Sequence, residues 1–278
     1  MMSLIKFITV YDDESQSLMY EDIMKTYNIS SYPPAYYFNN KMSVDGINTD
    51  STQFMKQKSE IECIRGPIIP ADVFKNAINN AYNQGFALAL IVCPNKKWYP
   101  YYYDAVKAAN RYRRSIKKDF RTFSVSVIDS RAFAAGSLYY TLQLARLHIN
   151  HHCPTGIILE DTKNLLSKTI VLTSSGERFG FKNGNLVAFR VIGKRLYKYM
   201  DISESSDYVK FNNFAKICER YVRLSGSKYI ISFGAGCYFS GNVIGRIEKL
   251  IGYPPVAISQ YGVASADVLG TETICIHF

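Results

Sequence analysis

The sequence predicts an α/β protein of two domains, an N-terminal parallel, doubly wound sheet and a C-terminal α/β domain with a mixed sheet. Up to residue 153, apolar runs of strand length alternate with segments of helical spacing, which is the pattern of a parallel sheet. Beyond Cys153-Pro154 the alternation changes, and Asn183-Gly184 between two β-prone runs indicates a hairpin. The length of 278 residues also suits two domains. We therefore predict domains of residues 1–153 and 154–278.

The elements of the first domain follow from hydrophobic spacing and from the positions of proline and glycine. The run 86–92 is continuously apolar, as expected of a strand buried on both faces. Pro70 in the first turn and Gly85 after the last turn delimit a helix. In chain order we expect a strand at 4–10, a helix around 19–27, an extended piece at 35–38, a helix at 70–81, a strand at 86–92, a helix from about 102, a strand at 123–128 and a helix at 132–147.

The second domain is expected to combine helices with shorter strands. The hairpin would join residues 178–181 to residues 186–191 through Asn183-Gly184. The other elements expected there are helices at 157–166, 206–224 and 243–251 and strands at 169–173, 229–233, 256–259 and 273–277. We find no internal repeat and no low-complexity tract.

Composition excludes several classes of protein but leaves the purpose of the charge open. With 47% apolar and 20% charged residues, the chain is not disordered, collagen-like or a coiled coil. It has 22 tyrosines, and 33 basic against 23 acidic side chains give a net charge of +10. Such a charge can bind phosphates, but it more often forms a solvated face or a docking site for an acidic partner, so we do not expect nucleic acid. The densest basic cluster is Lys107, Arg111, Arg113, Arg114, Lys117, Lys118 and Arg121.

The compartment is inferred from the N-terminus, the apolar runs and the cysteines. The N-terminus lacks the apolar stretch of a signal peptide, and the run 86–93 is far shorter than a membrane span. The six cysteines are scattered and form no C-x-x-C pair. We expect a cytoplasmic protein with free thiols that is not embedded in a membrane.

Two clusters have residue types that occur in cofactor or metal sites. Gly234-Ala235-Gly236 follows a strand, but Phe239 occupies the third glycine position of a dinucleotide fingerprint, and Asn242-Val243 replace the lysine and hydroxyl of a P-loop. We interpret this segment as a tight turn between a strand and a helix. The cluster of His148, His151, His152 and Cys153 has no second Cys/His pair nearby, and a helix end suits imidazole groups without a metal. We therefore expect no cofactor and no metal.

Three aspartates follow strands at the sheet edge where α/β proteins bind ligands. Asp12, Asp13 and Asp129 there have two interpretations: acid/base groups or metal ligands, and caps of the following helices. Capping is the commoner role, so we expect no catalytic residue. An enzyme would need at least two of them to converge on a metal or a water.

The aromatic segment 98–103, Trp-Tyr-Pro-Tyr-Tyr-Tyr, follows the strand at 86–92. Beside Lys96 and Lys97, these rings suit base stacking, the wall of an apolar cavity or packing between domains. Periodicity does not separate these three interpretations.

The chain resembles the DegV family in a series of segments that occur in the same order. Residues 8–13 resemble its opening strand and aspartate, and residues 32–38 resemble its extended Val-Pro-Leu stretch. Residues 44–49 are similar to its Arg-Asp-Gly-Val-Asp-Ile segment. Residues 127–131 are similar to its Ile-Asp-Ser block, and residues 251–262 to its Ile-Gly segment near the end. The resemblance implies two α/β domains with a fatty acid between them. It also implies a carrier that presents the fatty acid to a separate kinase, and not a catalyst.

The departures from the family fall on the segments that hold the head group of the lipid. Residues 65–68, Arg-Gly-Pro-Ile, stand where the family has Thr-Ser-Gln, and residues 95–101 replace its serine-rich loop. Gln260 replaces a histidine, whereas Arg190 matches a family arginine. These exchanges favour a more strongly anionic head group, such as an acyl phosphate. The resemblance gives these ligand-binding candidates: Arg65, Gly66, Asn95, Lys96, Arg190 and Gln260.

The leading hypothesis is therefore a bacterial, cytoplasmic, DegV-like lipid-binding protein that holds a fatty acid or a related amphipathic anion between its domains. Its expected partners are that long-chain lipid and a fatty-acid kinase subunit. The alternative is an interaction protein that has lost the ligand, with tyrosines filling the cleft and the basic helix docking a partner. An enzyme that uses Asp12, Asp13 and Asp129 is the third hypothesis.

Overall fold

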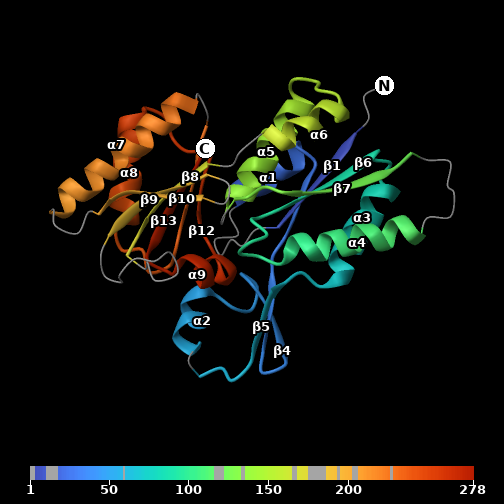
Figure 1. The fold of residues 1–278 in the computed structure, drawn as a ribbon, viewed down its shortest axis with the longest axis horizontal. Coiled ribbons are helices and arrows are strands. Elements are labelled where there is room, and N and C mark those ends of the chain that lie inside the picture. The colour runs from blue at the N-terminus through green and yellow to red at the C-terminus, as the bar shows by residue number, and fades with distance from the viewer. Residues whose placement is uncertain are drawn as a thin grey trace.

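The computed structural model describes residues 4–10, 18–58, 60–115, 122–132, 135–164, 168–174, 186–192, 195–201, 206–225 and 228–278. Two larger sheets and one small sheet organise this part of the chain (Figure 1). The first larger sheet uses strands from residues 5–129, and the second uses strands from residues 168–277. A domain boundary at residue 153 stays a prediction, because one hydrophobic core includes residues of both sheets.

The N-terminal sheet is parallel and doubly wound, as predicted. Its strands run in the order β2 (Ile29–Tyr32), β1 (Ile5–Val10), β6 (Leu88–Cys93) and β7 (Ser124–Asp129), and every neighbouring pair is parallel. Alternate side chains of β6 are buried on opposite faces of the sheet. Ala89 and Ile91 belong to one hydrophobic core, and Leu90 and Val92 belong to another. Helices α3 (Ala71–Asn83) and α4 (Tyr101–Ser115) cover one face, and α1 (Leu18–Thr26) and α5 (Gly136–Ile149) cover the other (Figure 1). Helix α6 (Thr155–Asn164) packs on α5.

The C-terminal sheet is mixed, which also confirms the prediction. Its order is β10 (Arg195–Asp201), β9 (Val187–Ile192), β8 (Lys168–Thr173), β13 (Thr273–His277), β11 (Ile230–Phe233) and β12 (Ala257–Gln260). Only the β11–β12 pair is parallel among these described pairs. Helices α7 (Asp207–Ser225) and α8 (Ser240–Ile251) pack together on one face. Asn183-Gly184 and residues 178–181 lie outside the described residues, but β8 and β9 on either side of them pair antiparallel.

A third, small sheet was expected only in part. It consists of β4 (Lys41–Val44), β3 (Ala35–Phe38) and β5 (Ile64–Ile68), all antiparallel. Asn39 and Asn40 join β3 to β4 with φ values of 47° and 69°, the positive values that a two-residue hairpin turn requires. Helix α2 (Ser51–Gln57) follows β4 and packs against α9 (Val263–Leu269) (Figure 1).

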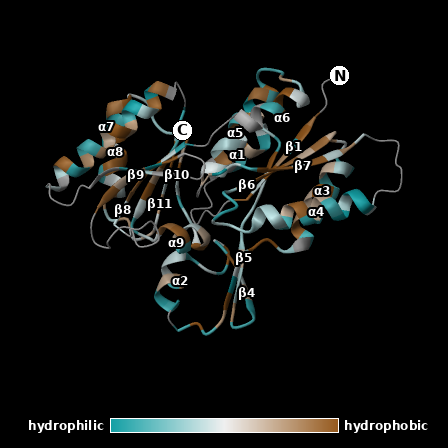
Figure 2. Cartoon of the chain, in the orientation of Figure 1, coloured by the Kyte–Doolittle hydropathy of each residue, from teal (hydrophilic) through white to brown (hydrophobic). Residues whose placement is uncertain are grey.

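One hydrophobic core crosses from the N-terminal sheet to the C-terminal sheet. On β8, Ile170 and Leu172 bury beneath α7 and α8, whereas Val171 belongs to the cluster that holds β6 and α4. Phe189 and Cys275 bury in the same direction as Val171. Figure 2 shows the strands of the larger sheets mainly in hydrophobic colours and hydrophilic stretches on the helices. Consequently, α9 and the residues near it lie between two sheets that share one core.

Two further sequence expectations can be compared with the structure. All six cysteines are free thiols, as expected. Burial raises the pKa of Cys93, Cys237 and Cys275, which keeps these thiols protonated. Within the described residues, no helix is both long and apolar enough to cross a membrane.

Candidate functional site

The loop after β6 is organised by Asn95, which is fully buried. The Asn95 carbonyl accepts hydrogen bonds from the N–H groups of Trp98 and Tyr99, both at 3.0 Å. Its side-chain Oδ1 accepts the N–H of Lys97, also at 3.0 Å. Its own N–H donates to the Ala132 carbonyl at 2.9 Å. Asn95 therefore fixes the turn that places the aromatic segment, and this use satisfies much of its hydrogen-bonding capacity.

Lys96 lies on the same loop, and its side chain is partly exposed. Its Nζ is 4.7 Å from the centroid of the Tyr102 ring and 4.0 Å from Oδ2 of Asp129. The other oxygen of Asp129 accepts the N–H groups of Lys96 at 3.3 Å and Arg131 at 3.0 Å. Asp129 thus ties two loops together at the end of the sheet. Lys96 remains a cation at this edge.

The enzyme hypothesis gains no support from this geometry. Asp129 is occupied with the two backbone N–H groups, and Asp12 and Asp13 lie outside the described residues. His148 Nδ1 is 3.0 Å from the Cys153 carbonyl oxygen, so this imidazole meets a carbonyl at the helix end as expected. In the described part of the chain, no group of three or more Cys, His, Asp or Glu residues is placed to hold a metal ion.

Tyr99 and Tyr101 occupy the region where the two larger sheets meet. Both side chains are buried, and their rings stack with centroids 5.7 Å apart at an interplanar angle of 17°. The Tyr99 hydroxyl lies 3.4 Å from Oγ of Ser265 on α9. Both rings belong to the core that includes Phe189 of the C-terminal sheet. Of the three interpretations of segment 98–103, this arrangement favours packing between the sheets for these two tyrosines.

Helix α9, which was not expected from the sequence, is held by three contacts with N-terminal residues. The buried carboxylate of Asp45 accepts the Ala264 N–H at 3.1 Å. The Lys58 ammonium is 2.6 Å from Oδ1 of Asp267. Tyr99 supplies the third contact, to Ser265. A Cβ at Gly262 would overlap the Asp45 carboxylate, so this close approach requires glycine.

Gln260 lies at the end of β12, three residues before α9. It borders an open hollow of about 490 Å³ that α2 lines from the other side. Arg65 is exposed on β5, where it pairs with Tyr37. Gly66 has a φ of 136°, and a Cβ there would lie 2.9 Å from the Ala35 carbonyl oxygen. Arg65 and Gly66 are thus part of the small sheet, at a bulge opposite β3.

The side chain of Arg190 packs on aromatic rings of the C-terminal half. Its guanidinium carbon lies 4.8 Å from the centroid of the Tyr221 ring on α7 and 5.9 Å from that of Tyr197 on β10. Its neighbours Phe189 and Val191 bury toward the N-terminal sheet, and alternation along a strand turns Arg190 to the opposite face. Arg190 therefore lies under α7, away from α9.

His277 is a residue of this region that the sequence did not single out. Its Nε2 is 2.8 Å from Oγ of Ser232, and its Nδ1 is 3.1 Å from Oγ1 of Thr169. A Cβ at Gly136, at the start of α5, would lie 2.8 Å from Nδ1, so the imidazole is at the contact between the C-terminal sheet and α5. Complete burial lowers the pKa of His277 to about 3 and keeps the ring neutral. The sequence pattern that could have indicated its burial is the alternation of β13, which places His277 on the same face as Cys275.

Comparison with known proteins shows the fold of the chain. No protein-family model and no curated protein sequence matches it. A stearic-acid-binding protein from Eubacterium ventriosum has a TM-score of 0.77 at 12% identity, over 99% of this chain and 97% of its own. A DegV family protein from Thermus thermophilus, described as fatty acid binding, has a TM-score of 0.73 at 13% identity, over 100% and 99%. This chain has the DegV fold.

A third solved structure matches the chain over its full length. A protein from Thermotoga maritima, described as revealing a fatty acid binding function, has a TM-score of 0.69 at 15% identity, over 100% of this chain and 99% of its own. The resemblance inferred from sequence segments is therefore confirmed at the level of the fold.

Proposed function

We propose that this protein is a carrier, not a catalyst, that holds a fatty acid or a related long-chain amphipathic anion between its two larger sheets. The observation that carries this proposal is the full-length structural match to proteins described with such ligands. Besides stearic acid in Eubacterium ventriosum, these are vaccenic acid in Ruminococcus gnavus and heptadecanoic acid in Eubacterium eligens. An apolar core that crosses between the sheets is a suitable surrounding for an acyl chain.

The head-group candidates remain Arg65, Gly66, Asn95, Lys96, Arg190 and Gln260, and the geometry supports them unequally. Lys96 offers a partly exposed cation on the loop after β6, and Gln260 borders the hollow beside α2. The side chain of Asn95 is used by its own loop, and Arg190 lies against Tyr221. We therefore propose that Lys96 and Gln260 contribute most to binding of the acid group.

The remaining features of the proposal concern the cellular setting. We place the protein in the bacterial cytoplasm, with domains of residues 1–153 and 154–278 and a fatty-acid kinase subunit as partner. Exposed Lys107, Arg111 and Arg114 on α4 provide a basic surface that suits an acidic partner, and Lys117, Lys118 and Arg121 lie outside the described residues. Arg113 is used internally, because it donates to the Val125 carbonyl at 2.7 Å.

The direct test is denaturing lipid extraction of the purified protein followed by mass spectrometry. We expect a fatty acid in near-stoichiometric amount from several expression hosts. After delipidation, oleate should raise the thermal midpoint, because a ligand that binds only the folded state stabilises it. Lys96→Met should reduce this rise, whereas Lys249→Met, an exposed lysine on α8, should not. A protein that is purified without lipid, and whose thermal midpoint does not change with oleate, would contradict the proposed carrier function.

A second candidate is a protein of the same fold whose own tyrosines fill the cleft. The stacking of buried Tyr99 on Tyr101 beside α9 favours it. The two candidates differ in one measurement, because a filled cleft binds no oleate before or after delipidation. In that case the basic surface of α4 would be the functional feature.

A further inference from the structure

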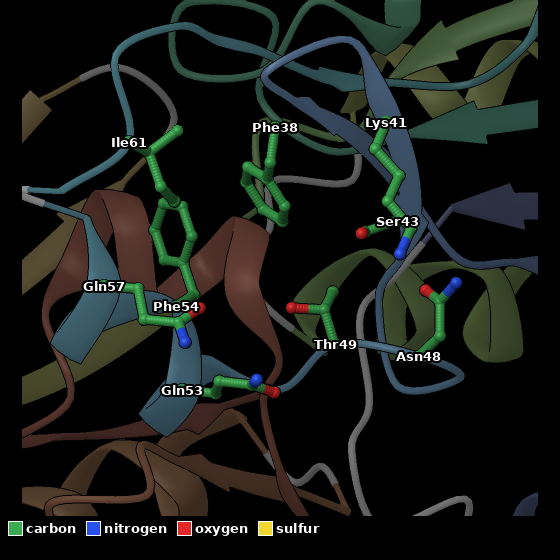
Figure 3. Close-up of a pocket in the computed structure, with 9 residues that line it drawn as sticks. All are labelled: Phe38, Lys41, Ser43, Asn48, Thr49, Gln53, Phe54, Gln57 and Ile61. Atoms are coloured by element: carbon green, nitrogen blue, oxygen red, sulfur yellow. The ribbon is translucent and has the colours of Figure 1, made fainter.

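A half-open cavity of about 270 Å³ lies between the small sheet and α2 (Figure 3). None of the head-group candidates lines it. The cavity thus differs from the proposed lipid cleft in its candidate residues, although Gln53 lines both this cavity and the hollow beside Gln260. The lining residues are Phe38, Lys41, Ser43, Asn48, Thr49, Gln53, Phe54, Gln57 and Ile61.

One side of the cavity is apolar and is formed mainly by aromatic rings. The rings of Phe38 and Phe54 lie with centroids 5.6 Å apart at an interplanar angle of 30°, and Ile61 lies beside Phe54 (Figure 3). Tyr36 stacks behind Phe38 at 5.7 Å and 16°, and Phe54 is itself buried. Such a surface favours a planar apolar group, because offset aromatic rings attract one another beyond the area that they bury.

The remaining lining side chains are neutral polar groups and one cation. Lys41 and Ser43 come from β4, and Gln53 and Gln57 lie one turn apart on α2. Lys41 is exposed, and among the described residues no carboxylate lies within ion-pair distance of it. Because no carboxylate lines the cavity, the local charge is positive, which favours an anion.

The walls are held in place without any ligand. Asn39, in the turn before Lys41, accepts the Cys63 N–H at 3.1 Å and donates its own N–H to the Cys63 carbonyl at 3.0 Å. Asn48 Oδ1 accepts the N–H of Val44 at 2.6 Å. Asp50 caps α2 by accepting the Gln53 N–H at 2.7 Å. A preformed cavity avoids part of the ordering cost of binding.

We propose that this cavity binds a small carboxylate with a flat apolar body, such as an aromatic acid. The ring would lie against Phe38 and Phe54, and the carboxylate would meet Lys41 with the hydroxyls of Ser43 and Thr49. At about 270 Å³ the cavity is just below the range of drug-sized pockets, so the ligand has roughly ten non-hydrogen atoms. The site does not depend on whether the cleft holds a lipid.

The experiment is a titration of the full-length ¹⁵N-labelled protein with benzoate, followed by amide chemical shifts. We expect saturable shifts within residues 38–61, with a dissociation constant on the order of 1 mM for so small a ligand. Benzamide, which matches benzoate in shape but is neutral, should bind at least fivefold more weakly. Shifts of equal size with benzamide, or shifts located only around residues 95–101 and 260–267, would overturn the proposal.

Two variants locate the charge. Lys41→Met keeps the apolar stem and removes the cation, and it should weaken benzoate roughly fivefold, as expected for a partly exposed charge pair. Gln57→Glu adds a negative charge, of the same sign as benzoate, on the exposed face of α2. It should also weaken the binding of benzoate. The control Lys249→Met on α8 should leave binding unchanged, as should prior saturation with oleate. Equal affinity in wild type and Lys41→Met disproves the assignment, whatever the result of lipid extraction.

Discussion

Asn95 and Arg190 have polar side chains that the fold already uses. The resemblance pointed to them because they stand at positions that contact the ligand in the family, but their contacts here are with a turn and with Tyr221. Lys96, in contrast, has a partly exposed side chain whose ammonium group lies beside Tyr102. Sequence position therefore gave the candidate residues, whereas the contacts of each side chain came from the structure, and the site itself stays a prediction.

His277 gives a prediction at this scale. Its pKa is lowered from about 6.5 to about 3 by burial, so the folded protein holds it neutral where the unfolded chain takes up a proton. The contribution of His277 to the free energy of unfolding is complete above pH 6.5 and is lost as the pH falls toward 3. At pH 5 the loss is roughly 2 kcal/mol.

Urea unfolding at pH 7.5 and pH 5 measures this effect. The wild type should lose stability between the two values, and His277→Asn should lose about 2 kcal/mol less, although it starts from a lower stability. His151→Asn, at an exposed histidine, is the control and should follow the wild type. Parallel losses in wild type and His277→Asn would show that His277 does not set the pH dependence.

At the scale of elements, the long apolar runs were predictable and the short elements were not. The strands at 5–10 and 88–93 follow from continuous apolar runs, because both faces of each strand are buried, and the helix at 101–115 follows from the spacing of its apolar residues. Helix α9 is different: it spans only seven residues, and six of them are buried, so no polar stripe reveals a helical period. Strands β4 and β10 are edges of their sheets, where exposure weakens the alternation of apolar and polar residues.

The position of α9 yields a prediction about glycine. Gly262→Ala should destabilise the protein by roughly 2 kcal/mol, because the new methyl group overlaps the Asp45 carboxylate that holds the helix. Gly245→Ala on α8 is the matched control. It has open space around it, so the exchange should stabilise the helix by about 0.5–1 kcal/mol.

Chemical unfolding of both variants gives the comparison. Opposite signs of the change in unfolding free energy are the expected result. If Gly262→Ala matches wild type, the contact between residues 45 and 262 is not a close one. If the protein is a fatty-acid carrier as proposed, Gly262→Ala should also weaken oleate binding after delipidation, because α9 borders the proposed head-group region.

At the scale of the whole molecule, the excess basic residues and the many tyrosines lie in different regions of the structure. The basic residues of α4 are on the outside, whereas Tyr99, Tyr101 and Tyr36 are buried in the core that joins the sheets. The small sheet and α2 form a third unit, connected to α9 by Lys58 and Asp267. The sequence predicted the two larger sheets and allowed packing between domains for segment 98–103, but it did not indicate that a single core would cross between the sheets.

This shared core predicts that the two halves unfold together. Val171, Phe189 and Cys275 bury against residues of the N-terminal half, so separating the sheets would expose apolar surface on both. Trp98, the one tryptophan of the chain, packs at this core and reports on it by fluorescence. Its urea transition should coincide with the loss of far-ultraviolet circular dichroism, and fragments 1–153 and 154–278 should not fold when expressed separately. Two separate transitions, or a folded fragment of either half, would instead show independent domains. A bound fatty acid should then move the single transition as a whole, because a ligand held between the sheets stabilises both at once.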